Sequence, residues 1–596
     1  MGRAFSEIIA DELEGVPAVF RVSPAQVRTG AAALGPRPAG APGISAERTA
    51  SLAEGANRIA YGQYEVRNGV VEAQVTVEDT RTGKMTVLNG VSAPVANLIS
   101  AASALAVEIS PRIAPYGTSD PEVVRIHVQA MEGLDAATAV TSLQKAIATD
   151  PNFGPTYQQL AQFKAQQRDI PGALALLDQA LARGDAMGAI ERGRIQLQSA
   201  TLRNDPAAIQ QSLAALAKAD PNDPLTWHEL ARSEMAAHQY AKAVEGYRKT
   251  IDIQPEDADT WNLLGYAAAY AGDTATATAS LLHYQKMLPS SSNPLDSLGD
   301  VNLIAGRLPE AESYYQQSAK KSPTSFGGLD FIKAAMAHLM TADIAGADAL
   351  AQRYFDARTA AKDPLVDYRK AQWSWISGRR KAACRQMEQV AHAAESDLVR
   401  EVGAHADAEL ALWNLMLGNR EAAAAVAQKA VAQATPSSAT EAILARFLAQ
   451  PPVTPAEWEA RANLIAPNPA QAPLRDLALA TALLFAKEYA AAAPVLQRMY
   501  DSGNNAAGEG LPVLLAWADL ETGHIPEAAG LLRFNPPLSD TGLSWSTALY
   551  FPRIYYLRAQ AAEKQGKADE ARQNYRLFQQ LSGSDTLLWG EEKKSQ

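Results

Sequence analysis

A chain of 596 residues is too long to fold around one compact hydrophobic core. Its 20% charged and 47% hydrophobic residues are typical of a folded protein and exclude a largely disordered one. The net charge of −11 argues against wholesale binding to nucleic acid or to an anionic membrane, and the one cysteine excludes both a disulfide framework and a cysteine-based zinc site within one chain.

The first 115 residues predict a small α/β domain. Its expected helices, judged from helical spacing of apolar residues, span 4–13, 24–32, 46–56 and 95–109. Its expected strands span 19–22, 58–64, 69–79 and 85–91. Residues 35–43 are rich in Gly, Pro and Ala and predict a loop. The strand over 69–79 should place Val71, Ala73, Val75 and Val77 on one face.

Three stretches of this domain, residues 2–9, 62–66 and 79–83, resemble the N-terminal domain of TolB-like proteins. The resemblance implies a bacterial signalling context, in which such a domain often precedes tetratricopeptide repeats. That family usually starts with a buried strand before the first helix, whereas this sequence begins at the helix. The sequence therefore leaves open whether a signal sequence, a membrane helix or an effector domain lies upstream, and it leaves the compartment open. We expect residues 1–596 to form a soluble segment with no membrane span.

Residues 224–325 contain three copies of one 34-residue pattern, a period that must be interpreted before any local motif. The copies end at Pro255, Pro289 and Pro323. Matching positions hold, in order, Trp227, Trp261 and Leu295, then Leu230, Leu264 and Leu298, then Ala231, Gly265 and Gly299, and then Ala243, Ala277 and Ala311. This pattern resembles the tetratricopeptide repeat (TPR). The resemblance implies helix pairs that stack, with the first helix of each pair lining a concave groove.

The expected fold class is mainly α: a right-handed α-α superhelix (TPR solenoid) preceded by the small α/β domain. The expected divisions are 1–115, the α/β domain; 116–325, a TPR array with the strict copies at 224–325; 326–435, divergent TPR units; 436–472, an irregular proline-rich helical segment; and 473–596, C-terminal helix pairs and a tail.

No motif for catalysis or metal binding emerges. The eight histidines have no metal-ligand spacing, and neither a phosphate-binding loop nor a nucleophile elbow is present. We therefore expect no cofactor, no metal, no catalytic residue and no enzymatic activity. One dense basic cluster comprises Arg369, Lys370, Arg379, Arg380, Lys381 and Arg385, with Trp373 and Trp375 among them. An exposed polar face with tryptophans in the core is favoured over nucleic-acid binding, and an anionic protein partner is the intermediate alternative.

Candidate partner-binding residues follow from the resemblance, because ligand contacts in TPR proteins gather on the first helix of each pair. The positions that match are His228, Arg232, Asn262, Tyr266, Tyr270, Asn293, Asp296 and Asp300. We expect these side chains to be free of the repeat core; the alternative is a plain solvated face.

The favoured function is a non-enzymatic scaffold that binds a protein or an extended peptide in the concave groove. The alternative is a sensory or regulatory segment of a bacterial signalling protein. The sequence identifies neither the partner nor the oligomeric state.

Overall fold

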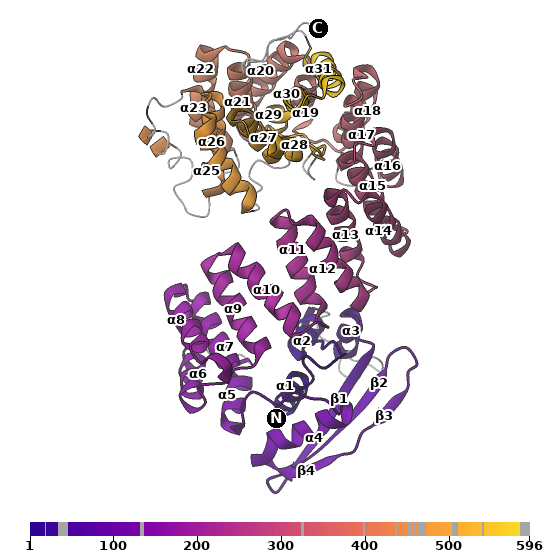
Figure 1. The fold of residues 1–596 in the computed structure, drawn as a ribbon, viewed down its shortest axis with the longest axis vertical. Coiled ribbons are helices and arrows are strands. Elements are labelled where there is room, and N and C mark those ends of the chain that lie inside the picture. The colour runs from indigo at the N-terminus through magenta and orange to yellow at the C-terminus, as the bar shows by residue number, and fades with distance from the viewer. Residues whose placement is uncertain are drawn as a thin grey trace. The chain divides into compact units, whose positions relative to one another are not determined.

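The computed structural model describes residues 1–17, 19–33, 46–131, 136–323, 327–396, 400–435, 438–450, 454, 456–457, 460–461, 472–502, 510–538 and 542–583. The chain forms two compact units (Figure 1). Unit 1 comprises Met1–Met235 with Lys242–Thr260, and unit 2 comprises Ala236–Ala241 with Trp261–Gln596. The predicted boundary after residue 115 lies inside unit 1. No helix among the described residues is both long and apolar enough to cross a membrane.

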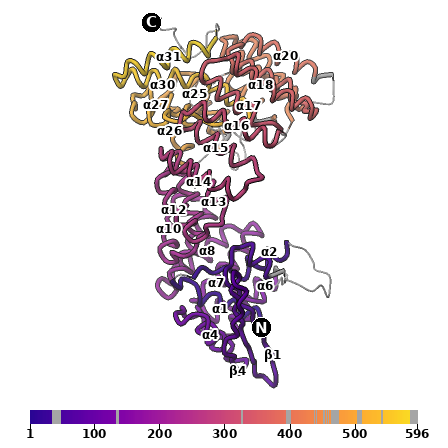
Figure 2. Tube along the Cα trace, turned by 90° about the vertical axis from the view of Figure 1, so that its right-hand side faces the viewer, coloured from indigo at the N-terminus to yellow at the C-terminus, as the bar shows by residue number. Residues whose placement is uncertain are grey.

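Unit 1 begins with three helices and a small antiparallel sheet. The helices are α1 (Gly2–Glu12), α2 (Pro24–Ala33) and α3 (Ala46–Ala53). The strands are β1 (Arg58–Arg67), β2 (Val70–Asp79), β3 (Met85–Val87) and β4 (Val91–Pro94), followed by α4 (Leu98–Ile109). Strand β2 pairs with each of the other three strands. Helices α1 and α4 lie together with these strands in both views (Figures 1 and 2).

The alternating pattern of β2 is confirmed. Val71, Ala73 and Val75 are buried against α1 and α4, while Val77 is half-buried. The tight turn before β2 uses Asn68 and Gly69, both at positive φ, as a two-residue hairpin requires.

Two strand predictions in this region need correction. Residues 19–22 are not in a strand: Arg21 pairs with Glu14 at 2.5 Å, which fixes this stretch as a connection beside α1. The predicted strand over 85–91 is two strands, β3 and β4, separated by a break at Leu88–Gly90 and both paired with β2. The predicted loop over 35–43 lies outside the described residues.

The remainder of unit 1 consists of helix pairs, as predicted. They are α5 (Pro121–Met131), α6 (Ala136–Thr149), α7 (Gly154–Gln166), α8 (Ile170–Leu181), α9 (Ala189–Arg203), α10 (Pro206–Ala219), α11 (Pro224–Ala236) and most of α12 (Tyr240–Ile253). Helices α8 and α10 start in the same way. Asp169 and Asp205 each accept a hydrogen bond from a first-turn amide, and each precedes a proline in that turn.

Unit 2 continues the array. Its helices up to α23 are α13 (Ala258–Ala271), α14 (Thr274–Met287), α15 (Asn293–Ile304), α16 (Leu308–Lys321), α17 (Leu329–Leu339), α18 (Ile344–Ala360), α19 (Val366–Ile376), α20 (Arg380–Ser396), α21 (Arg400–Met416), α22 (Arg420–Gln433) and α23 (Ala439–Ala449). The C-terminal helices are α25 (Ala472–Phe485), α26 (Tyr489–Asp501), α27 (Leu511–Thr522), α28 (Ile525–Leu531), α29 (Thr547–Tyr550), α30 (Arg553–Lys564) and α31 (Ala568–Ser582). One continuous hydrophobic core joins residues from Leu303 to Leu581. Most of the irregular segment expected over 436–472, and the tail, lie outside the described residues.

The small residues of the strict copies allow the two helices of a pair to pack closely. A Cβ atom on Gly265 would lie 2.6 Å from Leu281 Cγ, and one on Gly299 would lie 2.4 Å from the ring of Tyr315. Neither distance is possible for a real side chain, so glycine permits the approach. Gly272 and Gly306 have φ values of 86° and 75° just beyond α13 and α15, where a left-handed cap is expected.

The basic cluster is largely used in internal contacts. Trp373 and Trp375 are buried in the core, as the favoured interpretation predicted. Arg380 is also buried, which the sequence did not indicate, and donates a hydrogen bond to the carbonyl of Ser582 at the end of α31. Arg379 is partly exposed and pairs with Asp348 at 2.7 Å. This arrangement ties α20 to its neighbours.

Candidate functional site

The predicted partner-binding residues of unit 1 lie on α11. His228 is half-buried, with Nδ1 3.0 Å from the Thr260 hydroxyl and its ring edge-on to Tyr247. Arg232 is exposed and pairs with Glu229 one turn away. His228 therefore supports the packing of the helix pair, whereas Arg232 remains accessible.

In unit 2, Asp296 and Asp300 belong to a polar network with Lys333. Lys333 Nζ lies 2.8 and 2.9 Å from the two carboxylate oxygens of Asp296 and 3.2 Å from both oxygens of Asp300. Asp300 also accepts hydrogen bonds of 2.7 Å from the hydroxyls of Tyr266 and Tyr315. Lys333 and Asp300 are only 2% and 6% exposed. We name these five side chains the Lys333 network; it joins α13, α15, α16 and α17.

Burial dominates the electrostatics of this network. It raises the pKa of Asp296 to about 7 and that of Asp300 to about 6, although the Lys333 ammonium opposes both shifts. The two carboxylates in turn hold the pKa of Lys333 above its usual value despite its burial. Lys333 is therefore the cation that makes two buried carboxylates tolerable.

Tyr270 packs against a later part of the chain. The connection 532–538, which follows α28, returns to the strict copies, and we call it the return segment. Arg533 donates to the Tyr270 carbonyl at 3.1 Å, and the ring of Phe534 packs edge-on to that of Tyr270. Asn535 is buried and donates to the Leu303 carbonyl at 3.1 Å.

Arg558 holds the return segment from its other side. It donates hydrogen bonds of 2.8 to 2.9 Å to the carbonyls of Leu532 and Phe534 and to the amide oxygen of Asn535. The return segment is thus fixed at both of its surfaces.

The eight predicted residues consequently differ in availability. Arg232 and Asn293 are exposed, as expected, and Asn262 is half-buried. The expectation that all eight side chains are free of the repeat packing is wrong for Asp300, which is buried and hydrogen-bonded, and for Tyr266 and Asp296, which are bonded within the same network. It is also wrong for His228 and Tyr270, whose rings pack on those of Tyr247 and Phe534. Partner binding by these residues stays a prediction.

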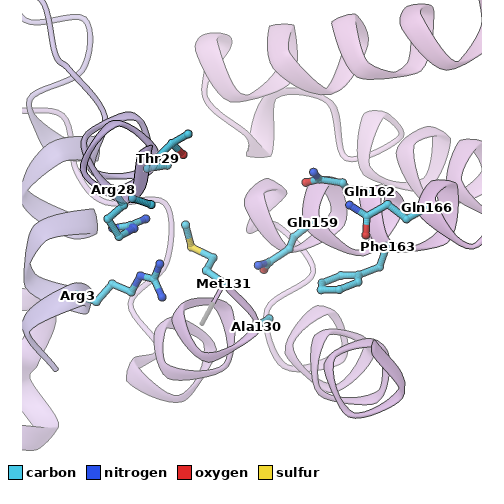
Figure 3. A pocket seen from close by; sticks show the side chains of 11 residues that line it. Arg3, Arg28, Thr29, Ala130, Met131, Gln159, Gln162, Phe163 and Gln166 are labelled. Carbon is cyan, nitrogen blue, oxygen red and sulfur yellow. The ribbon is translucent and has the colours of Figure 1, made fainter. Parts of the chain in front are cut away.

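Unit 1 contains a cleft that the sequence did not reveal. It comprises two adjoining cavities of about 460 and 490 Å³, which share the lining residues Met131, Gln159 and Gln162. Other lining residues include Arg3, Arg28, Thr29, Phe163 and Gln166 in the first cavity and His127, Gln158, Arg194, Leu197 and Gln198 in the second. We name it the glutamine cleft. Helices α1 and α2 supply one wall of the first cavity, and α5 and α7 supply the other (Figure 3). The second cavity is lined by α5, α7 and α9.

The sequence of α7 explains why glutamines line this cleft. Tyr157, Leu160 and Ala161 are buried in the hydrophobic core of unit 1. At 3.6 residues per turn, Gln159, Gln162 and Gln166 then fall on a different face of the same helix. Figure 3 shows these three amides on the wall opposite Arg3 and Arg28.

Three buried polar atoms of the cleft, Oε1 of Gln159, Oε1 of Gln198 and Nδ1 of His127, have no well-formed hydrogen bond among the described residues, although the Gln159 side chain lies near enough to His127 to oppose the lowering of its pKa. Burial also lowers the pKa of His127 to about 4, so its ring is neutral at neutral pH. Buried polar atoms are normally hydrogen-bonded, because each unmet one costs about 1–3 kcal/mol. The amides of Gln159, Gln162 and Gln166 on the wall of the cleft can offer both hydrogen-bond donors and acceptors to a ligand.

Sequence reasoning missed the cleft because it combines elements far apart in the chain. A signal was nevertheless present in the run of glutamines at 158, 159, 162, 166 and 167, since a helix face of amides rather than charges is unusual for a plain solvated surface. The second wall, with Arg3 and Arg28, had no counterpart in any local pattern.

Comparisons with known proteins agree with the repeat type. No family model matches the chain. It is 25% identical over 226 residues to Tetratricopeptide repeat protein 37 of Xenopus laevis, covering 37% of this chain and 14% of the relative. It is 25% identical over 191 residues to Superkiller complex protein 3 of Mus musculus, covering 30% of this chain and 12% of the relative. The chain thus spans a small part of the length of these relatives.

Solved structures that match part of the chain include two repeat proteins. YrrB, described as a TPR protein with an unusual peptide-binding site, is 14% identical, with a TM-score of 0.28, 31% of this chain covered and 94% of that one. The C-terminal part of a TPR repeat-containing protein from Cytophaga hutchinsonii is 14% identical, with a TM-score of 0.32, 39% of this chain covered and 93% of that one. The TolB-like resemblance of the N-terminal domain has no counterpart among these matches. The chain is an array of helix pairs similar to those of tetratricopeptide-repeat proteins, preceded by a small sheet.

Proposed function

We propose that this chain is a non-enzymatic scaffold that binds an extended peptide segment of a partner protein, and that the glutamine cleft of unit 1 is the contact site. The observation that supports the proposal is the row of glutamine amides of α7, Gln159, Gln162 and Gln166, that lines one wall of the cleft. Its two cavities have the size of a typical ligand site.

The chemistry of the cleft favours main-chain recognition. A glutamine side chain offers an acceptor and two donors, the same groups that a peptide bond offers and accepts. Gln198 is held in place, because its Nε2 donates a hydrogen bond of 3.1 Å to the main-chain carbonyl of Gln158. Met131 and Phe163 add apolar surface for a partner side chain.

A substitution that fills the cleft tests whether the cleft binds the partner. The full chain is immobilised, its partners are identified by mass spectrometry, and the best-enriched partner is purified and titrated against three forms of the chain. Gln162→Trp fills the cleft, while Gln129→Trp makes the same change at an exposed position of α5 that does not line it.

We expect Gln162→Trp to weaken binding at least about 10-fold, because a bulky ring displaces the peptide and its hydrogen bonds. Gln129→Trp should bind like the unchanged chain, and circular dichroism checks that both variants fold. Full binding by Gln162→Trp would exclude the cleft and return attention to the exposed residues Arg232 and Asn293.

The regulatory alternative rests on the TolB-like resemblance of residues 2–9, 62–66 and 79–83 alone. Reading the genomic open reading frame upstream of Met1 tests it. A kinase, cyclase or DNA-binding segment there would support it.

A further inference from the structure

We infer that strand β1 is a self-association surface, through which two copies of this chain pair edge to edge into one continuous antiparallel sheet. The inference goes beyond the proposed function and does not depend on it, since no described residue of β1 lines either cavity of the glutamine cleft. It rests on three features of β1: an open row of backbone groups, an incompletely covered apolar face, and a sequence that is complementary to itself.

Strand β1 is the terminal strand of the sheet, and among the described residues no strand pairs with its outer edge. It has 10 residues, and its register with β2 continues without a bulge from Arg58 to Arg67. The opposite edge of the sheet is built differently, from the short strands β3 and β4, and β4 ends at Pro94. Short strands, bulges and prolines are the usual protection against pairing with another chain, and β1 has none of them.

The ladder between β1 and β2 shows which backbone groups of β1 face outward. The Thr80 amide donates to the Asn57 carbonyl at 3.0 Å, just before β1 begins, and the bonding alternates from there along the antiparallel register. The odd-numbered residues of β1 therefore bond to β2, and the even-numbered ones direct their N–H and C=O groups away from the sheet. Beyond Arg58, the outward-directed residues are Ala60, Gly62, Tyr64 and Val66, and all four are exposed.

The side chains of these residues lie on the face of the sheet that packs against α1 and α4. Tyr64 lies opposite Ala73 of β2, and Val66 lies opposite Val71, both of which are buried under the two helices. The cover does not extend over β1, because Tyr64 is 49% exposed and Val66 is 45% exposed. A strand added beside β1 would bury part of both side chains through cross-strand contacts, which stabilises the pairing.

The sequence of β1 favours a second copy of the chain as the added strand. In an antiparallel pair centred on Gln63, Tyr64 lies opposite Gly62 of the second copy and Val66 lies opposite Ala60, so a large side chain meets a small one. The neighbouring register, centred on Gly62, would set that glycine against itself and Arg58 against Val66. The pair centred on Gln63 therefore buries more apolar surface and leaves no charge on the covered face.

The charges of the other face are compatible with this pairing. Glu65 and Arg67 are exposed there and already pair with each other at 2.7 Å. In the pair centred on Gln63 they would lie opposite Tyr61 and Ile59 of the second copy, so no like charges meet across the new ladder. A twofold interface requires one surface that fits itself, and β1 meets this requirement in both shape and charge.

Sedimentation velocity of the full chain, from nanomolar to high micromolar concentrations, tests the inference. We expect the mass to approach twice that of one chain as the concentration rises. Gly62→Pro should raise the dimer Kd at least about 10-fold, because it removes an outward N–H without removing a bond to β2. Its ring has room, since a Cβ atom at Gly62 would have no neighbour within 4 Å. Gly62→Ala retains the N–H and, as the matched control, should dimerise like the unchanged chain.

Val66→Lys is a second test that leaves the backbone unchanged. It places a charge on the covered face of the new ladder, and should weaken dimerisation by a similar factor. Because Val66 is 45% exposed, a single copy should tolerate the lysine. Circular dichroism and thermal unfolding check that both this variant and Gly62→Pro fold.

Cross-linking tests the register. Gln63→Cys, in a chain whose one cysteine is removed by Cys384→Ser, places two thiols opposite each other on the twofold axis. Residues of such a non-hydrogen-bonded pair have Cα atoms about 4.5 Å apart, which is within the range of a disulfide. A mild oxidant should therefore produce a covalent dimer on a non-reducing gel. Glu65→Cys is the matched control and should cross-link much less, because it lies opposite Tyr61 of the second copy.

Three results would overturn the inference. The first is a chain that remains monomeric at every concentration. The second is dimerisation of Gly62→Pro and Val66→Lys with an unchanged Kd, which would assign the contact to another surface. The third is equal cross-linking of Gln63→Cys and Glu65→Cys, which would exclude the pair centred on Gln63.

Discussion

Lys333→Met is the sharpest test of the electrostatics described for unit 2. The substitution retains the length and apolar stem of the side chain but removes the ammonium that lies 2.8–3.2 Å from four carboxylate oxygens of Asp296 and Asp300. Lys333 is 2% exposed, so water cannot replace it. Removal of one member of a buried ion pair costs about 3–5 kcal/mol in the free energy of unfolding, because the remaining charge is uncompensated.

The loss of unfolding free energy caused by Lys333→Met should increase with pH. A carboxyl whose pKa is higher in the folded than in the unfolded chain binds its proton more tightly when folded, so the free energy of unfolding falls as the pH rises through that interval. Burial raises the pKa of Asp300 to about 6 and that of Asp296 to about 7, from an unfolded value of 3.8. Without the Lys333 charge both values rise further. In the folded variant both carboxyls are therefore protonated at about pH 6. At about pH 8 their ionisation is favoured in the unfolded chain but opposed in the folded one, so the loss of unfolding free energy should be larger there by at least about 1.4 kcal/mol.

Urea-induced unfolding, followed by tryptophan fluorescence at these two pH values, measures the difference. The buried Trp373, Trp375 and Trp413 of the same unit report its unfolding. Lys286→Met, at an exposed position of α14, is the matched control and should change stability by less than about 0.5 kcal/mol. An equal loss at both pH values, or a loss no larger than that of the control, would refute the account of the Lys333 network.

Three further changes test the packing of the array. Gly299→Ala should lower stability by about 1–3 kcal/mol, measured by thermal unfolding, because its Cβ would lie 2.4 Å from the buried ring of Tyr315; a neutral effect would show that the ring can move. Glu409→Gln should remove a fall in stability that the unchanged chain shows as the pH rises from about 4 to about 7, since burial raises the pKa of this glutamate to about 7; identical pH profiles in urea unfolding would contradict this. Arg380→Met should speed amide hydrogen exchange at the end of α31, because the arginine donates a hydrogen bond to the Ser582 carbonyl. Unchanged exchange there would show that other contacts fix the end of α31.

The helix pairs were predictable because their signals are local. Close approach between paired helices requires a small residue at one fixed position, and Gly265 and Gly299 meet it. Caps and terminal prolines act within a few residues of the helix ends, so the period alone indicated three helix pairs over residues 224–325, where α11 to α16 lie.

The glutamine cleft and the surroundings of Tyr270 were not predictable in the same way. Arg28 and Gln159 are brought to one cleft by the docking of α1 and α2 against the first repeats, which no local pattern encodes. Tyr270 and Phe534 are separated by more than 260 residues, and their contact depends on how the later helix pairs of unit 2 return. Exposure inferred from a position within one repeat was therefore unreliable wherever another segment packs on that repeat, as with Tyr270 and Asp300.

The return segment bears on how this protein should be cut for experiments. A fragment that ends after the third strict copy would leave the ring of Tyr270 and the Leu303 carbonyl without Phe534 and Asn535. This fragment would expose an aromatic surface and an unsatisfied carbonyl. It would therefore bind proline-containing or aromatic peptides that resemble residues 534–538. Proteins captured by the fragment would bind where the return segment normally packs. Interaction screens therefore need a chain that extends at least through residue 583.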